Sequence, residues 1–371
     1  MKLRSLGLAA AAPIVSIVLA FVVSSAVLLA VGSSPIEAFS TMFEYGTRLE
    51  TIVDTFNRAT PLYISGVAVA IGFRMNLFNI GVEGQYTLAA LLAAVIGAEL
   101  NLWAPLHVVV IMGVAMVVGS TYAAIPGVLK VTRGVHEVIS TIMLNAIAVA
   151  LASYLLVKWQ VDDETLGTAT KEIPESGRMP NLNGVVEVFT REIGKGRELG
   201  GFLLVAVAVG VVYYVLINRT RLGFDLRATG SNPFAAEASG VPPRRTIVVA
   251  MMLSGMIAGL VGLAQVLGDT YRYDLNFTRQ LGFSGIAVAL VGRNHPAGIA
   301  AGALLFGFLD SAAPILDFEG DAPREIVIIM QAVIIFSVVV GYEIVRRIRS
   351  TDEARAAAAA LATAPVPEPS V

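Results

Sequence analysis

Residues Ser65–Ala94 read SGVAVAIGFRMNLFNIGVEGQYTLAALLAA, an apolar segment that is interrupted once and then resumes. The interruption covers Gly72–Asn79, and the helix that follows carries Asn79, Glu83 and Gln85 near its start. Irregular backbone at membrane depth occurs only where protein or a water-filled cavity satisfies its polar groups, and an ionisable side chain there indicates a functional site. The pattern therefore predicts a broken membrane helix with a polar cluster. The alternative is a cytoplasmic turn in which Glu83 is a solvated first-turn carboxylate, favoured by the helix dipole.

The composition of the whole chain is that of a membrane protein. Of its 371 residues, 56% are hydrophobic and only 15% are charged, whereas soluble proteins carry about 25% charged residues. The net charge of −2 gives no electrostatic footprint for nucleic acid. The chain has no cysteine, and its 3 histidines lack the HExxH spacing of a zinc site. The sequence therefore predicts neither a metal site nor nucleic-acid binding.

Several apolar segments are candidates for membrane helices, each of which needs about 20 residues to cross the bilayer. The second and the eighth are too short to cross untilted. The pattern predicts an all-α polytopic membrane protein with about ten transmembrane helices, and with short or broken helices in both halves. In chain order, the segments are Leu8–Val31, Pro61–Phe73, Leu77–Ala98, Ala104–Leu129, Val138–Val157, Gly201–Ile217, Thr246–Leu267, Phe283–Gly292, Gly298–Leu316 and Ile326–Val345.

Basic residues in the short loops predict the orientation of the chain. Lys2 and Arg4 precede the first segment, which is too long for the core of a secretory signal. With the N-terminus inside, most basic loop residues fall on the cytoplasmic side, the short outer loops lean acidic, and an even number of spans places both termini in the cytoplasm. We expect one transmembrane domain over residues 1–349. It would contain an extracytoplasmic loop at 158–200 and a cytoplasmic loop at 218–245, and a disordered cytoplasmic tail would follow at 350–371.

Two short segments of the chain are similar to each other. Ser65–Ile71 reads SGVAVAI and Ser284–Leu290 reads SGIAVAL, and Arg74 and Arg293 follow at the same offset. Strings of small apolar residues also match by chance, so an accidental similarity stays an alternative. Paired short or broken segments in the two halves of a chain indicate the binding site of a transporter.

The predicted cytoplasmic loop Asn218–Arg245 contains a short helix. Asn232 is a capping residue before Pro233, which suits the first helical turn, and Gly240 ends the helix expected at Phe234–Ser239. Composition leaves two interpretations open: an interfacial linker whose arginines contact lipid phosphates, or a helix that docks on a soluble partner. The candidate docking face consists of small residues, Ala235, Ala236 and Ala238.

Four motifs occur in order along the chain: FNIGVEGQ at Phe78–Gln85, GVHEVISTIMLN at Gly134–Asn145, LRATGSNPFAAEASGV at Leu226–Val241 and FSGIAVALVGRNHP at Phe283–Pro296. Together they resemble the permease subunits of bacterial ABC importers for nucleosides and simple sugars, relatives of the branched-chain amino-acid and ribose permeases. The early segment Ser33–Gly46 resembles the nucleoside branch in particular. The resemblance runs from about the first span to the last and leaves only the tail uncovered.

The resemblance implies roles for individual residues and for partners. The translocation path would be bordered by Asn79, Glu83, Gln85, Ser284 and Asn294. The loop that docks on the ATPase subunit would include Arg227, Gly230, Asn232, Pro233, Ala235, Ala236, Glu237 and Gly240. The protein would lie in the lipid of the bacterial cytoplasmic membrane as a multi-pass subunit. Its partners would be ABC ATPase subunits, a second permease that is identical or paralogous, and an extracytoplasmic substrate-binding lipoprotein.

The sequence has no GxxxxGK[ST] motif and therefore no phosphate-binding loop of its own. We expect a transport subunit without catalytic residues or bound cofactor, with ATP and Mg²⁺ on a partner chain. It would move nucleosides or simple sugars by alternating access. One alternative is an ion-coupled secondary transporter of a small polar solute, which needs ionisable residues within its spans; besides Glu83, only Asp310 lies clearly within one. A membrane-embedded enzyme is a further alternative, but no paired metal ligands or catalytic dyads support it.

Overall fold

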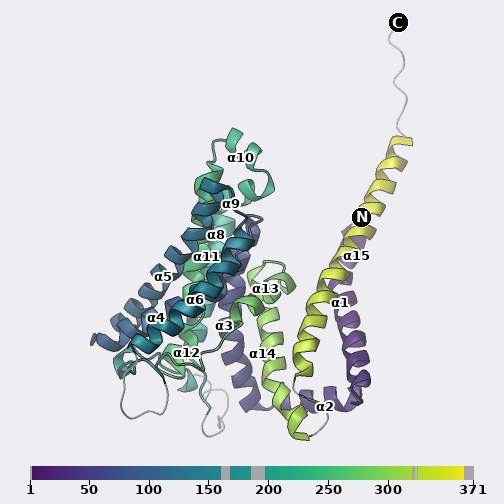
Figure 1. The fold of residues 1–371 in the computed structure, drawn as a ribbon. Coiled ribbons are helices and arrows are strands. Elements are labelled where there is room, and N and C mark those ends of the chain that lie inside the picture. Colours follow the sequence, from purple (N-terminus) through teal and green to yellow (C-terminus); the bar gives the residue numbers. More distant parts are fainter. Residues whose placement is uncertain (1, 160–167, 185–196, 320–321, 324, 363–371) are drawn as a thin grey trace. The chain divides into compact units, whose positions relative to one another are not determined.

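The computed structural model describes residues 2–159, 168–184, 197–319, 322–323 and 325–362 (Figure 1). Across these residues the chain is helical, with isolated bridges that join Ala169 to Asp274 and Asn181 to Gly200. The all-α prediction is confirmed. In chain order, the described elements are α1 Lys2–Ala30, α2 Pro35–Gly46, α3 Leu49–Arg74, α4 Val82–Glu99, α5 Ala104–Arg133, α6 Glu137–Trp159, the 3₁₀ turn η1 Glu175–Gly177, α8 Phe202–Arg219, α9 Arg221–Ser231, α10 Pro233–Ala238, α11 Pro243–Gly259, α12 Leu263–Gly268, α13 Leu281–Val291, α14 Pro296–Glu319 and α15 Ile326–Ala362.

The helices confirm a multi-pass membrane protein. Among the described residues, 5 helices are long and apolar enough to cross a bilayer: α5, α6, α8, the α11–α12 pair and α14. The pair α1–α2, bent by 114°, is a further candidate. About ten spans were predicted, which is more than these helices account for. That number and the cytoplasmic position of both termini stay predictions.

The second predicted segment, Pro61–Phe73, is not a short helix. It is the second half of α3, which has 26 residues. The residues before Pro61 are too polar to resemble a membrane segment, but threonine hydroxyls among them are satisfied by carbonyls one turn earlier in the same helix. Thr55 donates to the carbonyl of Thr51 over 2.7 Å, and Thr60 donates to that of Phe56 over 2.8 Å. The eighth segment was predicted to be short, and α13 with its 11 residues confirms this.

The chain forms two compact units. Unit 1 contains Met1–Met42 and Ala313–Val371, and unit 2 contains Phe43–Ala312. In unit 1, α1 packs against α15, and Ser16, Ala20, Ser24 and Leu28 are buried at four-residue spacing. Small residues at this spacing let helices in lipid approach closely. The single transmembrane domain over residues 1–349 stays a prediction.

The tail 350–371 was predicted to be disordered, and residues 158–200 were predicted to form an extracytoplasmic loop. Helix α15 extends to Ala362, so the described part of the tail is helical. Alanine has the highest helix propensity of the amino acids, which explains this continuation. Residues 363–371 of the tail, and 160–167 and 185–196 of the long loop, lie outside the described residues.

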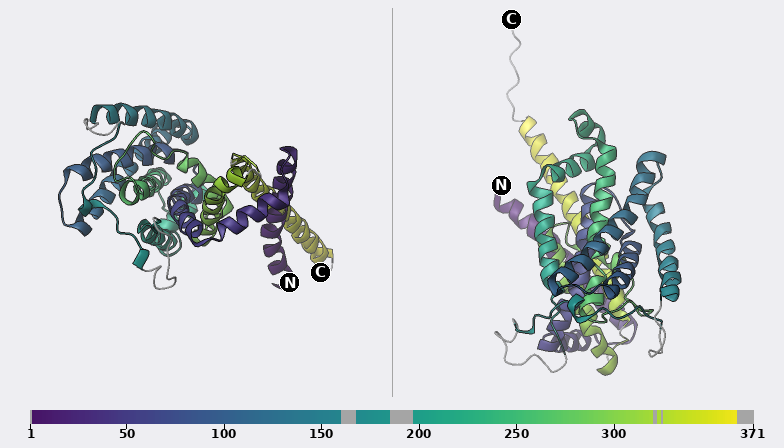
Figure 2. Two further views of the ribbon diagram at one scale, coloured as in Figure 1. Left: turned by 90° about the horizontal axis from the view of Figure 1, so that it is seen from below. Right: turned by 90° about the vertical axis from the view of Figure 1, so that its left-hand side faces the viewer.

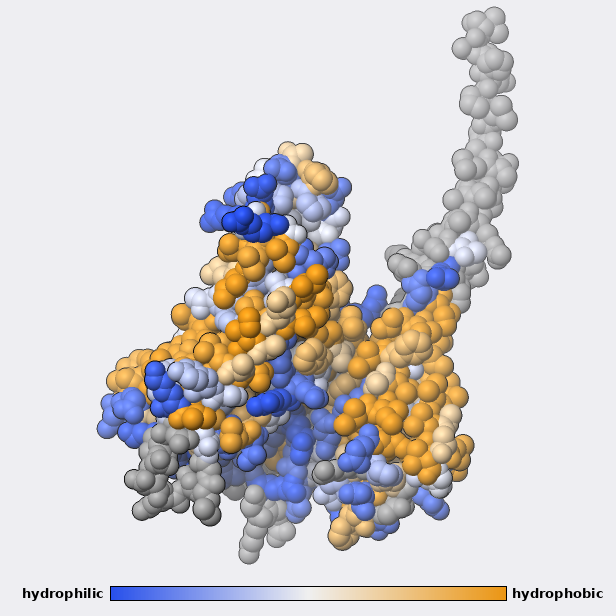
Figure 3. Space-filling view, in the orientation of Figure 1, coloured by the Kyte–Doolittle hydropathy of each residue, from blue (hydrophilic) through white to orange (hydrophobic). Residues whose placement is uncertain are grey.

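Unit 2 is a helical bundle around α4. Every residue from Gly81 to Leu91 is buried, and the polar residues Glu83, Gln85 and Thr87 are buried with the apolar ones. Figure 2 shows α9 and α10 at one end of the bundle, here called the α10 end, and the loop 168–184 at the opposite end. An apolar surface over α5, α6 and α8 separates the polar α10 end from polar residues at the opposite end (Figure 3). This banding fits a bilayer around the middle of unit 2.

Glycines bring α5 and α11 into backbone contact. A Cβ atom at Gly119 would collide with the carbonyl of Gly255, and one at Gly259 would collide with the carbonyl of Ala115. Close packing of this kind supplies van der Waals energy where lipid provides no hydrophobic driving force. Ser254 precedes Gly255 on the same helix, so this contact also fixes the position of a side chain in the site described next.

Candidate functional site

The interruption between α3 and α4 covers Met75–Gly81 and is held by a pair of buried amides. The Asn79 Nδ2 donates to Gln85 Oε1 over 3.0 Å, and the Gln85 Nε2 donates to Asn79 Oδ1 over 3.0 Å. Asn79 also donates to the hydroxyl of Ser254 over 2.8 Å, and Ser254 donates to the carbonyl of Ala68 over 2.6 Å. Asn79 and Gln85 are each 1% exposed. The predicted broken helix is confirmed, and its polar groups are satisfied by protein.

Helix α6 supports the same interruption from another side. The Asn145 side chain donates to the carbonyl of Ile80 and accepts from the N–H of Gly84, each over 2.9 Å. The Glu137 carboxylate accepts from the N–H of Phe78 over 3.4 Å and lies 2.5 Å from the Lys130 ammonium. The sequence interpretation did not select Asn145 or Glu137, although both stand in a motif that it quoted. Both are polar residues at or within an apolar segment, and this pattern could have identified them as candidates.

Glu83 is the N-terminal cap of a different helix. Its carboxylate accepts from the backbone N–H of Gln280 over 2.7 Å and from that of Gly282 over 2.9 Å, at the start of α13. The hydroxyl of Tyr86 lies 2.9 Å from the same carboxylate. Glu83 is 5% exposed, so the alternative of a solvated first-turn carboxylate is wrong. The first N–H groups of a helix lack intrahelical partners, and a carboxylate stabilises them through hydrogen bonds and the helix dipole.

The other end of α13 is held by two side chains from elsewhere. The carbonyl of Asn294 accepts from Arg74 Nη2 over 2.8 Å and from the Tyr213 hydroxyl over 2.7 Å. Arg74 Nε lies 3.3 Å from the same hydroxyl. Asn294 and Arg293 both adopt positive φ, 56° and 52°. Arg74 thus connects the end of α3 with the turn between α13 and α14.

The two similar segments found in the sequence pack against each other. The Ser65 hydroxyl donates to the carbonyl of Leu281 over 2.8 Å. A Cβ atom at Gly285 would lie only 2.7 Å from the Cβ of Ser65, and one at Gly66 would lie 2.7 Å from the Ile299 side chain. The α3 copy and the α13 copy are therefore direct neighbours, which the sequence did not specify.

The structure brings together some of the residues predicted to border the translocation path. Asn79 and Gln85 share one pair of hydrogen bonds, and Glu83 reaches the first turn of α13, where Ser284 is half-buried. Asn294 lies beyond the opposite end of that helix. In this conformation Asn79, Glu83 and Gln85 are enclosed by protein, and their role in the path stays a prediction.

The short helix predicted in the loop 218–245 is present at the α10 end. Helix α10 begins at Pro233, and the Asn232 side chain accepts from the N–H groups of Phe234 and Ala235 over 3.0 and 3.1 Å. Gly240 follows with a φ of 83°, which favours glycine. The preceding helix α9 was not predicted; its buried residues Gly223, Leu226 and Thr229 lie at three-residue spacing within a mainly polar loop.

The exposed face of α10 differs from the predicted one. Ala236 is only 3% exposed, whereas Phe234 is 83% exposed and Ala235 and Glu237 are also exposed. The prediction that Ala236 belongs to the outward face is wrong, because α10 packs against α9 and α11 and the Ala236 side chain is buried. The sequence interpretation did not identify Phe234 as an exposed residue of this face, although an aromatic residue in a polar loop could have indicated it.

Two predicted loop residues connect α9 to the bundle. The Arg227 guanidinium donates to the carbonyl of Ile217 at the end of α8. A Cβ atom at Gly230 would lie 2.7 Å from both the Arg74 carbonyl oxygen and the Met75 Cα. Gly230 therefore gives α9 direct contact with the end of α3, where the interruption begins.

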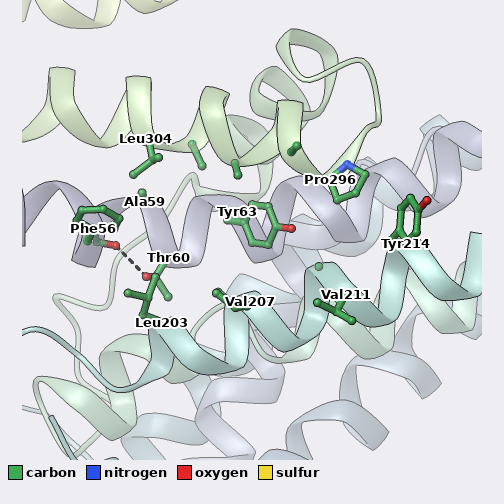
Figure 4. Close-up of a pocket in the computed structure, with 15 residues that line it drawn as sticks. Phe56, Ala59, Thr60, Tyr63, Leu203, Val207, Val211, Tyr214, Pro296 and Leu304 are labelled. Atoms are coloured by element: carbon green, nitrogen blue, oxygen red, sulfur yellow. Dashed lines mark hydrogen bonds between the residues drawn. The ribbon is translucent and has the colours of Figure 1, made fainter. Parts of the chain in front are cut away.

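An apolar pocket of about 430 Å³ lies between α3, α8 and α14 (Figure 4). Its hydroxyl at Thr60 already donates to the Phe56 carbonyl over 2.8 Å, and the Tyr63 ring lies across its middle. A polar solute buried here would find few hydrogen-bond partners, because the lining is apolar apart from Thr60, Tyr63 and Tyr214. The pocket suits apolar groups, and none of the predicted path residues lines it. The lining residues are Phe56, Ala59, Thr60, Tyr63, Leu203, Ala206, Val207, Gly210, Val211, Tyr214, Pro296, Ala297, Ala300, Ala303 and Leu304.

Comparison with known families matches residues 51–339 to the family described as branched-chain amino acid transport system/permease component. The chain is 34% identical to the guanosine ABC transporter permease NupP of Bacillus subtilis, over 90% of this chain and 93% of that protein. It is 31% identical to the nucleoside ABC transporter permease NupB of Lactococcus lactis, over 89% and 90%. It is also 31% identical to the glucose ABC transporter permease TsgB13 of Haloferax volcanii, over 88% and 86%.

Bacillus subtilis and Lactococcus lactis each have a second permease that is similar to this chain. They are the guanosine permease NupQ and the nucleoside permease NupC, each 25% identical to it. These matches cover 68% and 69% of this chain, less than NupP and NupB do.

Proposed function

The chain belongs to the family of branched-chain amino acid transport system/permease components, and on this basis we propose that it is the permease subunit of an ABC importer for nucleosides. The observation that carries the proposal is identity of 34% and 31% to a guanosine and a nucleoside permease over about nine-tenths of every chain involved. The subunit would lie in the bacterial cytoplasmic membrane and move its substrate by alternating access. Simple sugars are the second candidate substrate, supported by 31% identity to a glucose permease.

The α10 end would be cytoplasmic and would bind the ATPase subunits. Basic residues gather in the loop Asn218–Arg245, as the positive-inside rule requires of a cytoplasmic loop. The exposed Phe234 side chain offers an apolar anchor, and Asn232 fixes the helix that presents it. Aromatic anchors in a small, well-defined patch contribute much of the binding energy of protein interfaces. ATP and Mg²⁺ would be bound by those partner subunits.

The second permease would be a paralogue rather than a second copy. NupP and NupQ share an organism and a named substrate, and so do NupB and NupC. In each pair this chain is more similar to one member, which supports a complex in which the other member is a different chain. An extracytoplasmic lipoprotein that delivers the substrate would bind at the end opposite α10.

The path residues would act in a different conformation from the one described. Asn79, Glu83 and Gln85 have their hydrogen bonds satisfied by protein here, so they could contact solute only after the network around α4 rearranges. Ser284 and Asn294 are half-buried on or beside α13 and are closer to solvent. We expect weak contacts along the path, because capture of the solute would belong to the lipoprotein. An ion-coupled mechanism finds no support in Glu83, which serves as a helix cap.

The test is uptake by the reconstituted importer. This chain would be purified with its neighbouring permease, ATPase and lipoprotein and placed in liposomes that contain ATP. We expect radiolabelled guanosine or uridine to accumulate, and accumulation to stop when ATP is replaced by ADP. Accumulation of glucose in place of nucleosides would select the second candidate. Uptake that follows a proton or sodium gradient without ATP would contradict the proposal.

A further inference from the structure

Helix α13 is a half-length helix that runs beside α3 (Figure 1). Its 11 residues extend about 16 Å at 1.5 Å per residue, roughly half of the 30 Å hydrocarbon core. Both of its ends are held by side chains that flank the interruption Met75–Gly81: Glu83 at the first turn and Arg74 after the last. A short helix held in this way can shift as a unit when one attachment changes.

Strained backbone marks both attachments of α13. Within the described chain, 5 non-glycine residues have positive φ, and 4 of them are Asn76, Gln280, Arg293 and Asn294. Gln280 is the residue before the helix, and Arg293 and Asn294 form the turn after it. Such conformations persist only where the surroundings impose them, and they are concentrated in switch regions and functional sites.

The turn after α13 is also incompletely bonded. The Asn294 side-chain oxygen is shielded from solvent and accepts no hydrogen bond from the described residues. The backbone carbonyl of the same residue accepts two, from Arg74 and Tyr213. A shielded acceptor without a donor is unfavourable. A second conformation of this turn could therefore be stabilised by a hydrogen bond to the Asn294 side-chain oxygen. The described turn is therefore suited to be one of two alternatives.

Arg74 is within reach of the loop proposed to bind the ATPase. Gly230 of α9 packs directly on the Arg74 carbonyl and the Met75 Cα, with no room for a side chain. Helix α10 follows α9 after the single residue Asn232. A displacement of α10 would therefore press on the backbone of Arg74, whose guanidinium holds the turn after α13.

We propose that α13 is the helix that changes position between the two access states, and that Arg74 is the positioning residue that transmits movement of α9 to it. The proposal rests on the proposed function, since it needs a partner that moves α10. Arginine suits this role because its planar fork can serve the Asn294 carbonyl and the Tyr213 hydroxyl together. A lysine in its place keeps the positive charge, but all its N–H donors lie on one nitrogen instead of on a planar fork.

The natural chain has no cysteine, so α13 can be labelled without further changes. Spin labels would be attached to Leu290→Cys on α13 and Val128→Cys on α5, both exposed. Their distance would be measured by pulsed electron paramagnetic resonance in the complete importer in liposomes, before and after trapping with ATP and vanadate. We expect the distance distribution to shift on trapping.

The Arg74→Gln variant separates transmission from folding. We expect it to assemble with its partners and to keep ATP hydrolysis within about twofold, while nucleoside uptake falls about tenfold or more and the shift in label distance disappears. Arg74→Lys should recover part of both the uptake and the shift. Arg133→Gln is the matched control, because it removes an exposed basic side chain at the end of α5, where uptake and distances should stay unchanged.

If ATP-driven uptake is normal but the label distance is the same before and after trapping with ATP and vanadate, this inference is overturned while the proposed function stands. Normal uptake by Arg74→Gln would also overturn it. Uptake without ATP dependence in the unmodified importer would instead overturn the proposed function, and this inference with it.

Discussion

Glu83 accepts a hydrogen bond of 2.9 Å from the backbone N–H of Gly282, a residue 199 positions further along the chain. The bond joins the first turn of α4, where Glu83 lies, to the start of α13, which its carboxylate caps. Its position explains why an ionisable residue is tolerated inside an apolar bundle: its partners are N–H groups that otherwise remain unsatisfied.

Replacing Glu83 by alanine should destabilise the protein by about 1–3 kcal/mol for each N–H group left unpaired. Glu83→Gln keeps one acceptor and should lose less. Thermal unfolding in detergent, followed by fluorescence-detected size-exclusion chromatography, measures the difference. Glu44→Ala is the control, because Glu44 is exposed on α2 and should have little effect. Equal stability of Glu83→Ala and the natural chain would rule out the capping role.

Gly282→Ala should destabilise the same junction sterically. An added Cβ would lie 2.5 Å from the backbone nitrogen of Glu83 and 2.9 Å from its Cα. Overpacking of this kind typically costs about 1–3 kcal/mol. Gly113→Ala in α5 is the matched control, because nothing lies within 4 Å of its Cβ; it should be neutral or slightly stabilising through helix propensity. If both variants unfold at the same temperature, the close approach at Gly282 is not real.

Phe234→Ala and Ala235→Asp should weaken binding of the ATPase without changing the stability of this chain. Both side chains are exposed on α10, so their replacement disturbs only a surface. We expect about tenfold or greater loss of ATPase that co-purifies in a pull-down, as for an interface anchor, together with loss of uptake. Ala236→Asp should behave differently and lower the folded yield, since its side chain is buried. Unchanged ATPase binding in the first two variants would place the docking surface elsewhere.

Asn79 and Gln85 should behave as a coupled pair. Replacing Asn79 by alanine leaves the buried Gln85 amide without its two bonds to Asn79, and replacing Gln85 removes the same two bonds from Asn79, so the double variant should be less destabilised than the sum of the two. A double-mutant cycle on thermal unfolding should give an interaction energy of about 0.5–3 kcal/mol. An additive cycle would mean that the two amides do not depend on each other.

The helical class, the interruption before α4 and the short α13 could all be predicted from the sequence. Apolar segments of sufficient length and the polar cluster FNIGVEGQ carry these features locally. The capped helix at Pro233 was equally visible, because its cap and its first residue are adjacent in the chain. Local signals of this kind need no knowledge of the tertiary structure.

The partners of each polar residue could not be predicted. Nothing near Glu83 in the sequence indicates that it binds Gln280 and Gly282. Hydrogen bonds between residues so far apart in the sequence depend on how the helices of the bundle pack. The full length of α3 was missed because polar residues before Pro61 hide a helix from a hydropathy criterion. The inward side of Ala236 was missed because a helix of 6 residues has too few turns to show a period.

The reciprocal bonds of Asn79 and Gln85 use dipoles where many membrane transporters use ions. An amide neither gains nor loses a proton at physiological acidity, and it carries no net charge on which a transmembrane voltage could act. This amide pair is therefore insensitive to the pH of either compartment and to the membrane potential, unlike the charged Glu137 contact to Phe78 in the same interruption. If ATP hydrolysis on a partner subunit drives transport, as proposed above, that subunit could control when the amide pair opens without a direct effect of ion gradients on the pair.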